Sequence, residues 1–424
     1  MYLTSAEEAM LNGEMGELIA EVFNYTVKFG DAFDAEKMVD IVYAHHPAEM
    51  AIYRGEVESI IELADKGAKV SVPTTSSTLC MDLDQWQKTG VPADLAEKQV
   101  KVVEPHQRMG IIGTYTCTPY LLGYIPPKAS YTATVESSAI IYYNSVLGVK
   151  TNRGGIFTKF SAITGKYPYM GYLLDENRKG THLVNVKLPK DKLRSALDYN
   201  LLGFYIGDVV GSEVPVIDNI DAHPGTYQQE NLIGMGAALA TSGSISLYHV
   251  PGVTPEARTV EEAFQGDRPK EQFDVGLDEL AAVREKMTTA SDSKIDFVTL
   301  GCPHYNLDQL RIVADMLDGN KIHPDVRLWV CTNRMTKQAA EWNGYVATIE
   351  AAGGLVICDS CPVESHMRTS TCIEYGLPTP QINTMVTEST KMARYVKDLI
   401  GCETILTDLK GCINSAISGK WEGD

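Results

Sequence analysis

Apolar residues in the last third of the chain follow two alternating patterns. Short runs of consecutive apolar residues are typical of strands buried on both faces. They alternate with longer segments whose apolar residues recur every three or four positions, as in helices. Strands that alternate with helices are joined by crossover connections, so we expect a parallel sheet whose strands all end along one edge. The pattern predicts strands at 296–302, 326–332 and 355–361, and helices at 275–289, 306–319 and 337–353.

The earlier part of the chain has weaker patterns. Residues 5–28 and 34–43 have helical spacing, and Ser5 is placed to begin a capping box. A further helix and a Gly turn lead into a strand that ends near Thr75. Residues 109–180 are rich in Gly, Thr, Ser, Asn and Tyr, a composition more typical of loops that line a site than of a core layer.

These patterns predict an α/β protein in three parts. Residues 1–70 would form an N-terminal helical segment, and residues 71–265 an α/β region that contains the substrate site. Residues 266–424 would form a doubly wound α/β domain. In such a domain, ligands bind at the carboxyl ends of the strands.

Composition narrows the class of protein. The 424 residues are 44% hydrophobic, enough for two or three buried cores, and the net charge of -18 argues against a nucleic-acid partner. No apolar run approaches the roughly 20 residues that cross a bilayer. The first residues lack the basic segment of a signal peptide, so we expect a cytoplasmic protein without a membrane partner. Nine cysteines in such a chain predict reduced thiols rather than a disulfide framework.

Several cysteines fall where a ligand site is expected. Cys302, Cys331, Cys358 and Cys361 lie at or near the ends of the predicted strands, and Cys117 lies in a hydroxyl-rich turn. Three thiolates from three remote loops would suit an iron–sulfur cluster with one iron left open. The residues alone leave alternatives open at Cys358 and Cys361, namely a redox pair, half a zinc site, or a buried core cysteine at Cys358.

Polar residues gather in two further stretches. Residues 136–155 end in a predicted loop, KTNRGG, in which Arg153 could hold a carboxylate or phosphate with two hydrogen bonds. A solvated loop with ordinary helix caps explains this stretch equally well. His45 and His46 precede a proline; such a pair is more often at the surface than a ligand, although histidine readily carries protons near neutral pH.

Five motifs, in this order, resemble those of the aconitase X family: TCTPYLLGYIPP, ESSAIIYYNSVLGVKTNR, ITGKYPYMGYLLDENR, VTLGCPH and CDSCPV. The resemblance runs from the first residues to about residue 400 and concerns the large catalytic part of the family. It implies aconitase-like three-layer α/β/α domains with parallel or mixed sheets. It also implies an iron–sulfur cluster and the dehydration of a small hydroxy acid. Known activities in the family are cis-3-hydroxy-L-proline dehydratase and mevalonate 5-phosphate dehydratase.

The resemblance assigns expected roles to particular residues. Carried over by motif, the cluster cysteines are Cys117, Cys302 and Cys361. With the neighbouring polar residues, the candidate catalytic groups are Ser145, Glu136 and His46. The candidate substrate-binding residues are Thr75, Ser137, Asn144, Lys150, Thr151, Asn152 and Arg153.

The chain departs from the family pattern at two places. After the TNR motif the family usually has an acidic residue, two glycines and a proline, but here Gly154 to Phe157 read GGIF. The segment usually small and hydroxyl-bearing is here His45 to Met50, HHPAEM. If both segments line the pocket, the substrate could differ from both known ones. The family also needs a small swivelling domain, which implies a separate small subunit as partner.

Two other functions use the same cysteines. A non-catalytic iron–sulfur or thiol redox sensor would need the thiols but not the polar residues at 136–153. A thiol–disulfide enzyme would need Cys358 together with Cys361. The hydro-lyase interpretation requires both the thiols and the polar residues.

Overall fold

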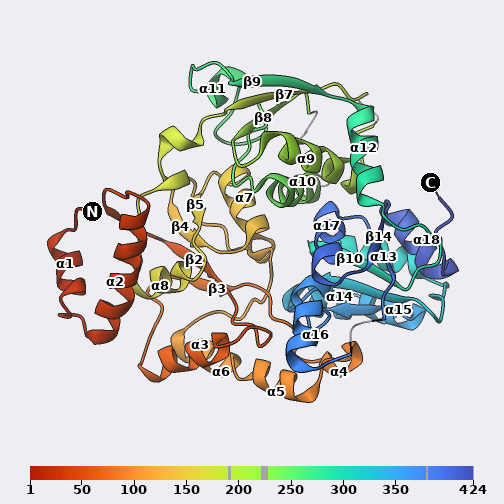
Figure 1. The fold of residues 1–424 in the computed structure, drawn as a ribbon, viewed down its shortest axis with the longest axis horizontal. Coiled ribbons are helices and arrows are strands. Elements are labelled where there is room, and N and C mark those ends of the chain that lie inside the picture. The colour runs from red at the N-terminus through yellow and green to blue at the C-terminus, as the bar shows by residue number, and fades with distance from the viewer. Residues whose placement is uncertain (190–191, 221–227, 379–380, 424) are drawn as a thin grey trace.

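The structure is a computed structural model that describes residues 1–189, 192–220, 228–378 and 381–423. Its elements form three lobes, each built on a parallel sheet (Figure 1). We call them the first lobe (1–178), the second lobe (179–288) and the third lobe (289–423). No described helix is both long and apolar enough to cross a membrane.

The first lobe holds a four-stranded parallel sheet in the order β3, β2, β4, β5. The strands of the whole lobe are β1 (Met38–Asp40), β2 (Tyr43–His46), β3 (Thr74–Ser76), β4 (Tyr131–Thr134), β5 (Lys150–Arg153) and β6 (Lys166–Pro168). Its helices are α1 (Ser5–Leu11), α2 (Glu17–Ala32), α3 (Glu56–Asp65), α4 (Trp86–Thr89), α5 (Ala93–Val100), α6 (Val103–Met109), α7 (Ser137–Ser145) and α8 (Phe157–Thr164). Ala44 of β2 packs with α8, and its neighbour Tyr43 packs with α7, so helices cover both faces of the sheet.

The second lobe is a smaller three-stranded parallel sheet in the order β8, β7, β9. Its elements are β7 (His182–Val186), α9 (Ala196–Val210), β8 (Pro215–Asp218), α10 (Gln228–Gly243), α11 (Val260–Ala263), β9 (Glu271–Val275) and α12 (Leu277–Met287). Helices α9 and α10 approach closely because glycines lie between them. A Cβ on Gly203 would lie 2.4 Å from the Met235 carbonyl oxygen, so a larger residue there would separate the helices.

The third lobe is a five-stranded sheet in the order β12, β11, β10, β13, β14, with every pair parallel. Its strands are β10 (Phe297–Tyr305), β11 (Arg327–Thr332), β12 (Leu355–Ile357), β13 (Thr384–Thr387) and β14 (Glu403–Leu406). Its helices are α13 (Leu307–Leu317), α14 (Arg334–Trp342), α15 (Tyr345–Ala352), α16 (Thr369–Tyr375), α17 (Thr390–Leu399) and α18 (Leu409–Ser418).

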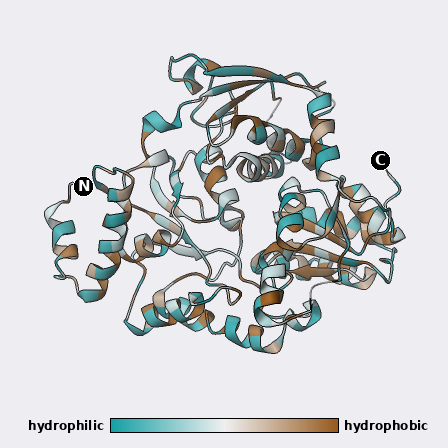
Figure 2. Ribbon diagram, viewed as in Figure 1, coloured by the Kyte–Doolittle hydropathy of each residue, from teal (hydrophilic) through white to brown (hydrophobic). Residues whose placement is uncertain are grey.

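Consecutive residues in these strands bury opposite faces of the sheet. Phe297 packs toward Met392 of α17, whereas Val298 packs toward Val313 of α13. A parallel sheet covered on both faces needs apolar residues at nearly every position, which explains the continuous apolar runs of the sequence. Figure 2 shows hydrophobic residues along the strands and on the helix faces turned toward them.

The parallel sheet predicted for the last third of the chain is confirmed, and the α/β fold class with it. Asn306 caps α13 with its side chain, and the predicted helix at 337–353 is two helices separated at Gly344. Strands β13 and β14, which the sequence analysis did not predict, complete the sheet.

Three expectations for the N-terminal part of the first lobe are wrong. Residues 34–43 lie in and around β1 and β2 because pairing with neighbouring strands outweighs their helical spacing. The predicted helix at 5–28 is interrupted between α1 and α2, where Gly13 and Gly16 have positive φ. The capping box is made by Thr4 with Glu7, one residue before Ser5.

The segment 109–180 also differs from its prediction. KTNRGG begins with strand β5, not a loop, because Lys150–Arg153 pairs with β4. Eight residues of α7 are buried, so this polar segment contains a core layer. Its Ser, Thr and Asn side chains are tolerated inside because they bond to backbone groups, as Asn144 does with Thr151.

Gly301, next to Cys302 in β10, offers a test of how the sheet edge is built. It has φ +85°, and a Cβ there would lie 2.1 Å from the Cys331 carbonyl oxygen. Gly319 has φ +71° with open space around its Cβ position. Gly319→Ala should cost about 1 kcal/mol of unfolding free energy for the left-handed backbone. Gly301→Ala should cost about 3 kcal/mol of unfolding free energy, because overpacking against the Cys331 carbonyl group adds to the cost of the left-handed backbone. Denaturant unfolding of the two variants measures this difference, and equal losses would contradict it.

Candidate functional site

A cavity of about 330 Å³ lies between the first and third lobes, where the carboxyl ends of their sheets face each other. From the first lobe it is lined at or beyond the ends of β2, β3, β4 and β5 by Pro47, Ala48, Met50, Ser77, Thr78, Val135, Glu136, Ser137 and Arg153, and by Cys117 from a loop. From the third lobe it is lined at or beyond β10, β12 and β13 by Gly301, Cys302, Pro303, His304, Cys361, Val363, Glu364, Lys391, Tyr395 and Leu399. Parallel α/β sheets place their ligands at this edge.

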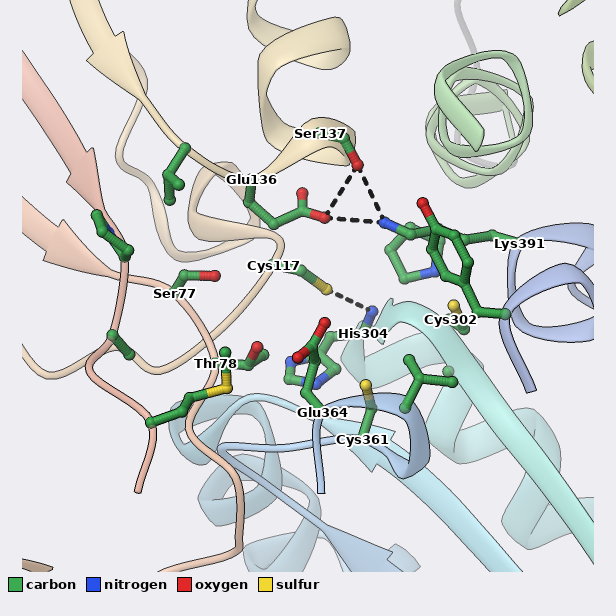
Figure 3. Close-up of a pocket in the computed structure, with 18 of the residues that line it drawn as sticks. Ser77, Thr78, Cys117, Glu136, Ser137, Cys302, His304, Cys361, Glu364 and Lys391 are labelled. Atoms are coloured by element: carbon green, nitrogen blue, oxygen red, sulfur yellow. Dashed lines mark hydrogen bonds and ion pairs between the residues drawn. The ribbon is translucent and has the colours of Figure 1, made fainter. Parts of the chain in front are cut away.

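Three cysteine thiols reach the cavity from three separate segments. Cys117 comes from the loop after α6, Cys302 from β10, and Cys361 from the turn before a short 3-10 helix, Pro362–Glu364 (Figure 3). The His304 backbone N–H donates to Cys117 Sγ over 3.3 Å. Burial raises the pKa of all three thiols, and for Cys361 the charge of Glu364 and the other thiols add to this effect.

The spread of the three thiols fits a group larger than a single ion. A metal ion bound to three cysteines would hold their sulfurs at about 2.3 Å from itself, and so within about 4 Å of one another. Among the described residues, Cys117, Cys302 and Cys361 are not one of the groups whose ligand atoms all lie within 4.8 Å. Three thiols around one cavity, too far apart for a single ion, are a donor set for a polynuclear iron–sulfur cluster.

Glu136 and Lys391 form an ion pair across the cavity wall. Lys391 Nζ lies 2.8 Å from Glu136 Oε1 (Figure 3). It also lies 2.7 Å from Ser138 Oγ, and both charged side chains are largely buried. Glu136 is the N-cap of α7, where a carboxylate is favoured. Lys391 lies in the first turn of α17, where the helix dipole disfavours a cation, so Glu136 compensates an otherwise costly charge.

The pair fixes the charge state of both groups. Burial alone would raise the pKa of Glu136, but the charge of Lys391 and its hydrogen bond outweigh this and hold the pKa below the ordinary 4.5. Burial alone would lower the pKa of Lys391, yet Glu136 raises it above its ordinary value. Both groups are therefore charged at neutral pH.

The cavity also contains a second carboxyl group and an unpaired cation. Burial raises the pKa of Glu364, opposed by Arg368, whose Nη1 lies 3.2 Å from Glu364 Oε2. Arg153 is exposed, and no hydrogen bond or ion pair joins its side chain to another described residue. Its guanidinium is thus available to an anionic ligand.

Six of the sequence-predicted residues line this cavity: Cys117, Glu136, Ser137, Arg153, Cys302 and Cys361. Sequence reasoning missed Lys391, Glu364, Ser77, Thr78 and His304. Lys391 could have been found by the rule that identified the cysteines, because it follows the carboxyl end of a strand, β13. That strand was not predicted.

The other candidates do not line the cavity. Several of them form hydrogen bonds within the first lobe or with the neighbouring second lobe. Asn144 donates to Thr151 O and accepts from Arg178, and Ser145 Oγ accepts from the Tyr248 N–H. Thr75 Oγ1 lies 2.8 Å from His45 Nδ1.

The side chains of Lys150 and Asn152 also bond to other residues of the first lobe, whereas the His46 side chain has no hydrogen-bond partner among the described residues. Lys150 pairs with Asp175 at 2.6 Å, and Asn152 donates to Met170 O at 2.8 Å. His46 is fully buried behind the cavity wall. The catalytic and substrate-binding roles expected for these residues stay predictions.

Models of three domains match almost the whole chain. They are described as the aconitase X first domain, at residues 1–176, second domain, at 180–285, and third domain, at 295–418. The three-part division predicted from the sequence stays a prediction.

Similar proteins of named activity align over the full chain. A phosphomevalonate dehydratase large subunit of Methanothermobacter thermautotrophicus is 37% identical, over 96% of this chain and 97% of that protein. A cis-3-hydroxy-L-proline dehydratase of Pseudomonas aeruginosa is 32% identical, over 99% of this chain and 70% of that protein. The crystal structure of Thermococcus kodakaraensis aconitase X, in its holo-form, superposes with a TM-score of 0.84 at 34% identity, over 98% of this chain and 100% of that one.

Removing Lys391 should expose the cost of a buried, unpaired carboxylate. We expect Lys391→Met to lower the free energy of unfolding at neutral pH by about 3 kcal/mol. Because the folded-state pKa of Glu136 lies below 4.5, the pair stabilises the protein above that pH, and the contribution fades as pH falls through the lower folded value. Denaturant unfolding across pH measures both effects.

Two controls accompany this variant. The double variant Glu136→Gln/Lys391→Met should recover most of the loss, because no charge is then buried without a partner. Lys286→Met breaks an exposed pair with Asp208 and should cost less than about 1 kcal/mol. A loss as small for Lys391→Met as for Lys286→Met would contradict the assigned pairing.

Proposed function

The chain belongs to the aconitase X family, and from this premise we propose that it is the large, catalytic subunit of a hydro-lyase that dehydrates a small hydroxy acid. One observation carries the proposal: three thiols, an unpaired arginine and a Glu–Lys pair, all from remote segments, line one cavity. Relatives that share this family are named phosphomevalonate dehydratase large subunit and cis-3-hydroxy-L-proline dehydratase. A protein that only sensed redox state would need the thiols and not the other groups.

We propose that Cys117, Cys302 and Cys361 hold an iron–sulfur cluster. Support comes from their positions around one cavity and from a spread too wide for a single ion. When bound, such a cluster supplies an iron that acts as a Lewis acid toward a hydroxyl or carboxylate oxygen of the substrate. Deprotonation of the thiols, whose pKa values burial raises, would accompany cluster insertion.

Glu136 is proposed to accept the carbon-bound proton of the substrate. Paired with Lys391 it is ionised but weakly basic. An anionic substrate bound in the cavity adds negative charge near Glu136 and displaces water from it, and both effects raise the basicity of Glu136 once the site is filled. Glu364, whose pKa burial raises, is proposed to give a proton to the departing hydroxyl group, which leaves as water while the carbon–carbon double bond forms.

Arg153 is proposed to hold an anionic group of the substrate. It is the described lining residue with a cation and no partner, because Lys391 is neutralised by Glu136. One free cation can bind one carboxylate. A substrate that also carries a phosphate would need further positive groups from outside this set of residues. The substrates named for the relatives, one with and one without a phosphate, are both to be tested.

A separate small subunit is proposed as partner. Support comes from the words "large subunit" in the names of several relatives, and from the exposed position of Arg153 at the cavity. A partner that covered Arg153 would exclude water and strengthen its interaction with an anion. The nine free cysteines support action in the reducing cytoplasm.

Cysteine variants test the proposed function. We expect Cys302→Ala to lose the sulfide-to-iron absorption, the bound iron and the dehydratase activity, measured anaerobically with the small subunit present. Cys358→Ala is the matched control, because Cys358 is buried outside the cavity lining and should keep all three. A Cys302→Ala protein that kept its iron would contradict the assignment of Cys302 as a cluster ligand. Loss of activity in Cys358→Ala with full iron would instead favour a thiol–disulfide enzyme.

Arg153→Met tests recognition of the substrate anion. Loss of a charged hydrogen bond worth about 1.5–3 kcal/mol should raise KM roughly 10- to 100-fold, with a smaller effect on kcat. Arg153→Lys should recover part of the loss, and Arg258→Met, an exposed arginine outside the cavity lining, should change neither constant. Steady-state rates with cis-3-hydroxy-L-proline and with mevalonate 5-phosphate provide the measurement. An unchanged KM with the substrate that is turned over would contradict the role of Arg153.

A further inference from the structure

A group of potential metal ligands lies buried behind one wall of the cavity. His46 at the end of β2, Glu49 just after it, and His106 of α6 place one ligand atom each within 4.8 Å of the others. Glu49 Oε2 lies 2.9 Å from His106 Nε2 and 3.8 Å from His46 Nε2. All three side chains are at most 3% exposed.

His46 lacks the partners that a buried imidazole requires. Neither of its ring nitrogens has a hydrogen-bond partner among the described residues, and 3.8 Å to Glu49 is too long for a hydrogen bond. A fully buried polar group left unpaired costs about 1–3 kcal/mol. Such a group in a folded protein points to an ion or water that satisfies it.

The charge states suit a cation. Neither ring nitrogen of His46 has a hydrogen-bond partner among the described residues, so the nitrogen that carries no hydrogen has a lone pair free to bind a cation. Glu49 Oε1 lies 2.6 Å from Lys159 Nζ, and this buried ion pair keeps the carboxyl group ionised. The group thus offers imidazole nitrogens and a carboxylate oxygen, the ligands that zinc takes in open sites.

We propose that His46, Glu49 and His106 bind one Zn²⁺ ion, at a site separate from the cluster cysteines. In a tetrahedral zinc site with ligands at about 2.0–2.1 Å, the ligand atoms lie about 3.3 Å apart. The observed 2.9 and 3.8 Å bracket this separation, so small side-chain movements complete the site. A water molecule takes the fourth position.

Neighbouring side chains give the site an outer shell. Lys159 Nζ lies 2.6 Å from Glu49 Oε1, the oxygen that does not face the histidines, and so leaves Oε2 for the ion. The hydroxyl of Tyr115 lies 3.4 Å from His106 Nδ1, where it can orient the ring. The ammonium of Lys159 also repels the cation, so the ion is held less tightly than it would be by the same ligands alone.

The ion would brace a wall of the cavity. Pro47, Ala48 and Met50 line the cavity and alternate along the chain with the two ligands His46 and Glu49. Fixing those ligands to His106 fixes the wall that the substrate meets. The segment His45–Met50 is also where this chain departs from the family pattern. The zinc site does not depend on the proposed reaction, and its test does not measure activity.

The test compares zinc and iron in the same protein. The chain is loaded with its cluster, incubated with Zn²⁺, freed of excess metal, and analysed for both elements. We expect one zinc per chain in the wild type, less than a tenth of that in His46→Gln and His106→Gln, and unchanged iron in all three. His45→Gln is the matched control, because it removes an equally buried neighbouring imidazole outside the group and should keep its zinc. Anomalous scattering at the zinc edge should locate the ion between the three side chains.

Lys159→Met provides an independent test in which binding should improve. Removal of the ammonium group should lower the zinc Kd at least about tenfold, because the repulsion between the cations disappears. If Glu49 and Lys159 form only a structural ion pair, neither the wild type nor Lys159→Met should bind zinc. The proposal is overturned if iron-replete wild type takes up no zinc, if His46→Gln retains it, or if the anomalous peak lies at the cluster cysteines.

Discussion

The buried ion pair between Glu136 and Lys391 is the interaction on which the site depends. It joins the N-cap of α7 in the first lobe to the first turn of α17 in the third, and so connects the ends of two sheets from separate segments of the chain. Each charge alone would be costly to bury, and a cation at a helix N-terminus doubly so. The two are tolerable only together, which means that the lobes must meet in the one arrangement that forms the cavity.

A second set of ion pairs supports the same junction. In the first lobe, Asp82 Oδ2 lies 3.3 Å from Lys337 Nζ, and Asp84 Oδ2 lies 2.6 Å from Arg334 Nη1. Lys337 and Arg334 both belong to α14 of the third lobe. Arg334 also bonds Asp359, two residues before Cys361. The turn that presents this thiol is therefore held by charges from both lobes. Rigid support of this kind lets residues remote in sequence keep fixed positions around a ligand.

The cavity separates two kinds of chemistry by their surroundings. On the side of the third lobe, Cys302 and Cys361 present thiols whose pKa values burial raises, and these are two of the three thiols proposed to hold a cluster. On the side of the first lobe, Glu136 and Arg153 present charge. Behind the wall formed by Pro47, Ala48 and Met50, the residues His46, Glu49 and His106 form a buried group with an unsatisfied imidazole. If that group holds zinc, one metal centre shapes the wall while the other faces the substrate. The hydro-lyase proposal and the zinc proposal then describe adjoining but independent parts of one structure.

The sequence by itself determined the elements whose signals are local. Continuous apolar runs identified three strands of the third lobe, and the rule that ligands bind at strand ends singled out Cys302 and Cys361. Short strands such as β2 and β13 were not predicted, because a few residues carry little periodicity and their pairing partners are remote in the chain. Only the tertiary structure decided that Lys391 meets Glu136, that Asn144 and Ser145 serve the interior of the fold, and that His46 lies behind the cavity wall. The physical reason is that burial and charge pairing depend on neighbours brought together by the whole fold, whereas hydrophobic spacing is already present in the unfolded chain.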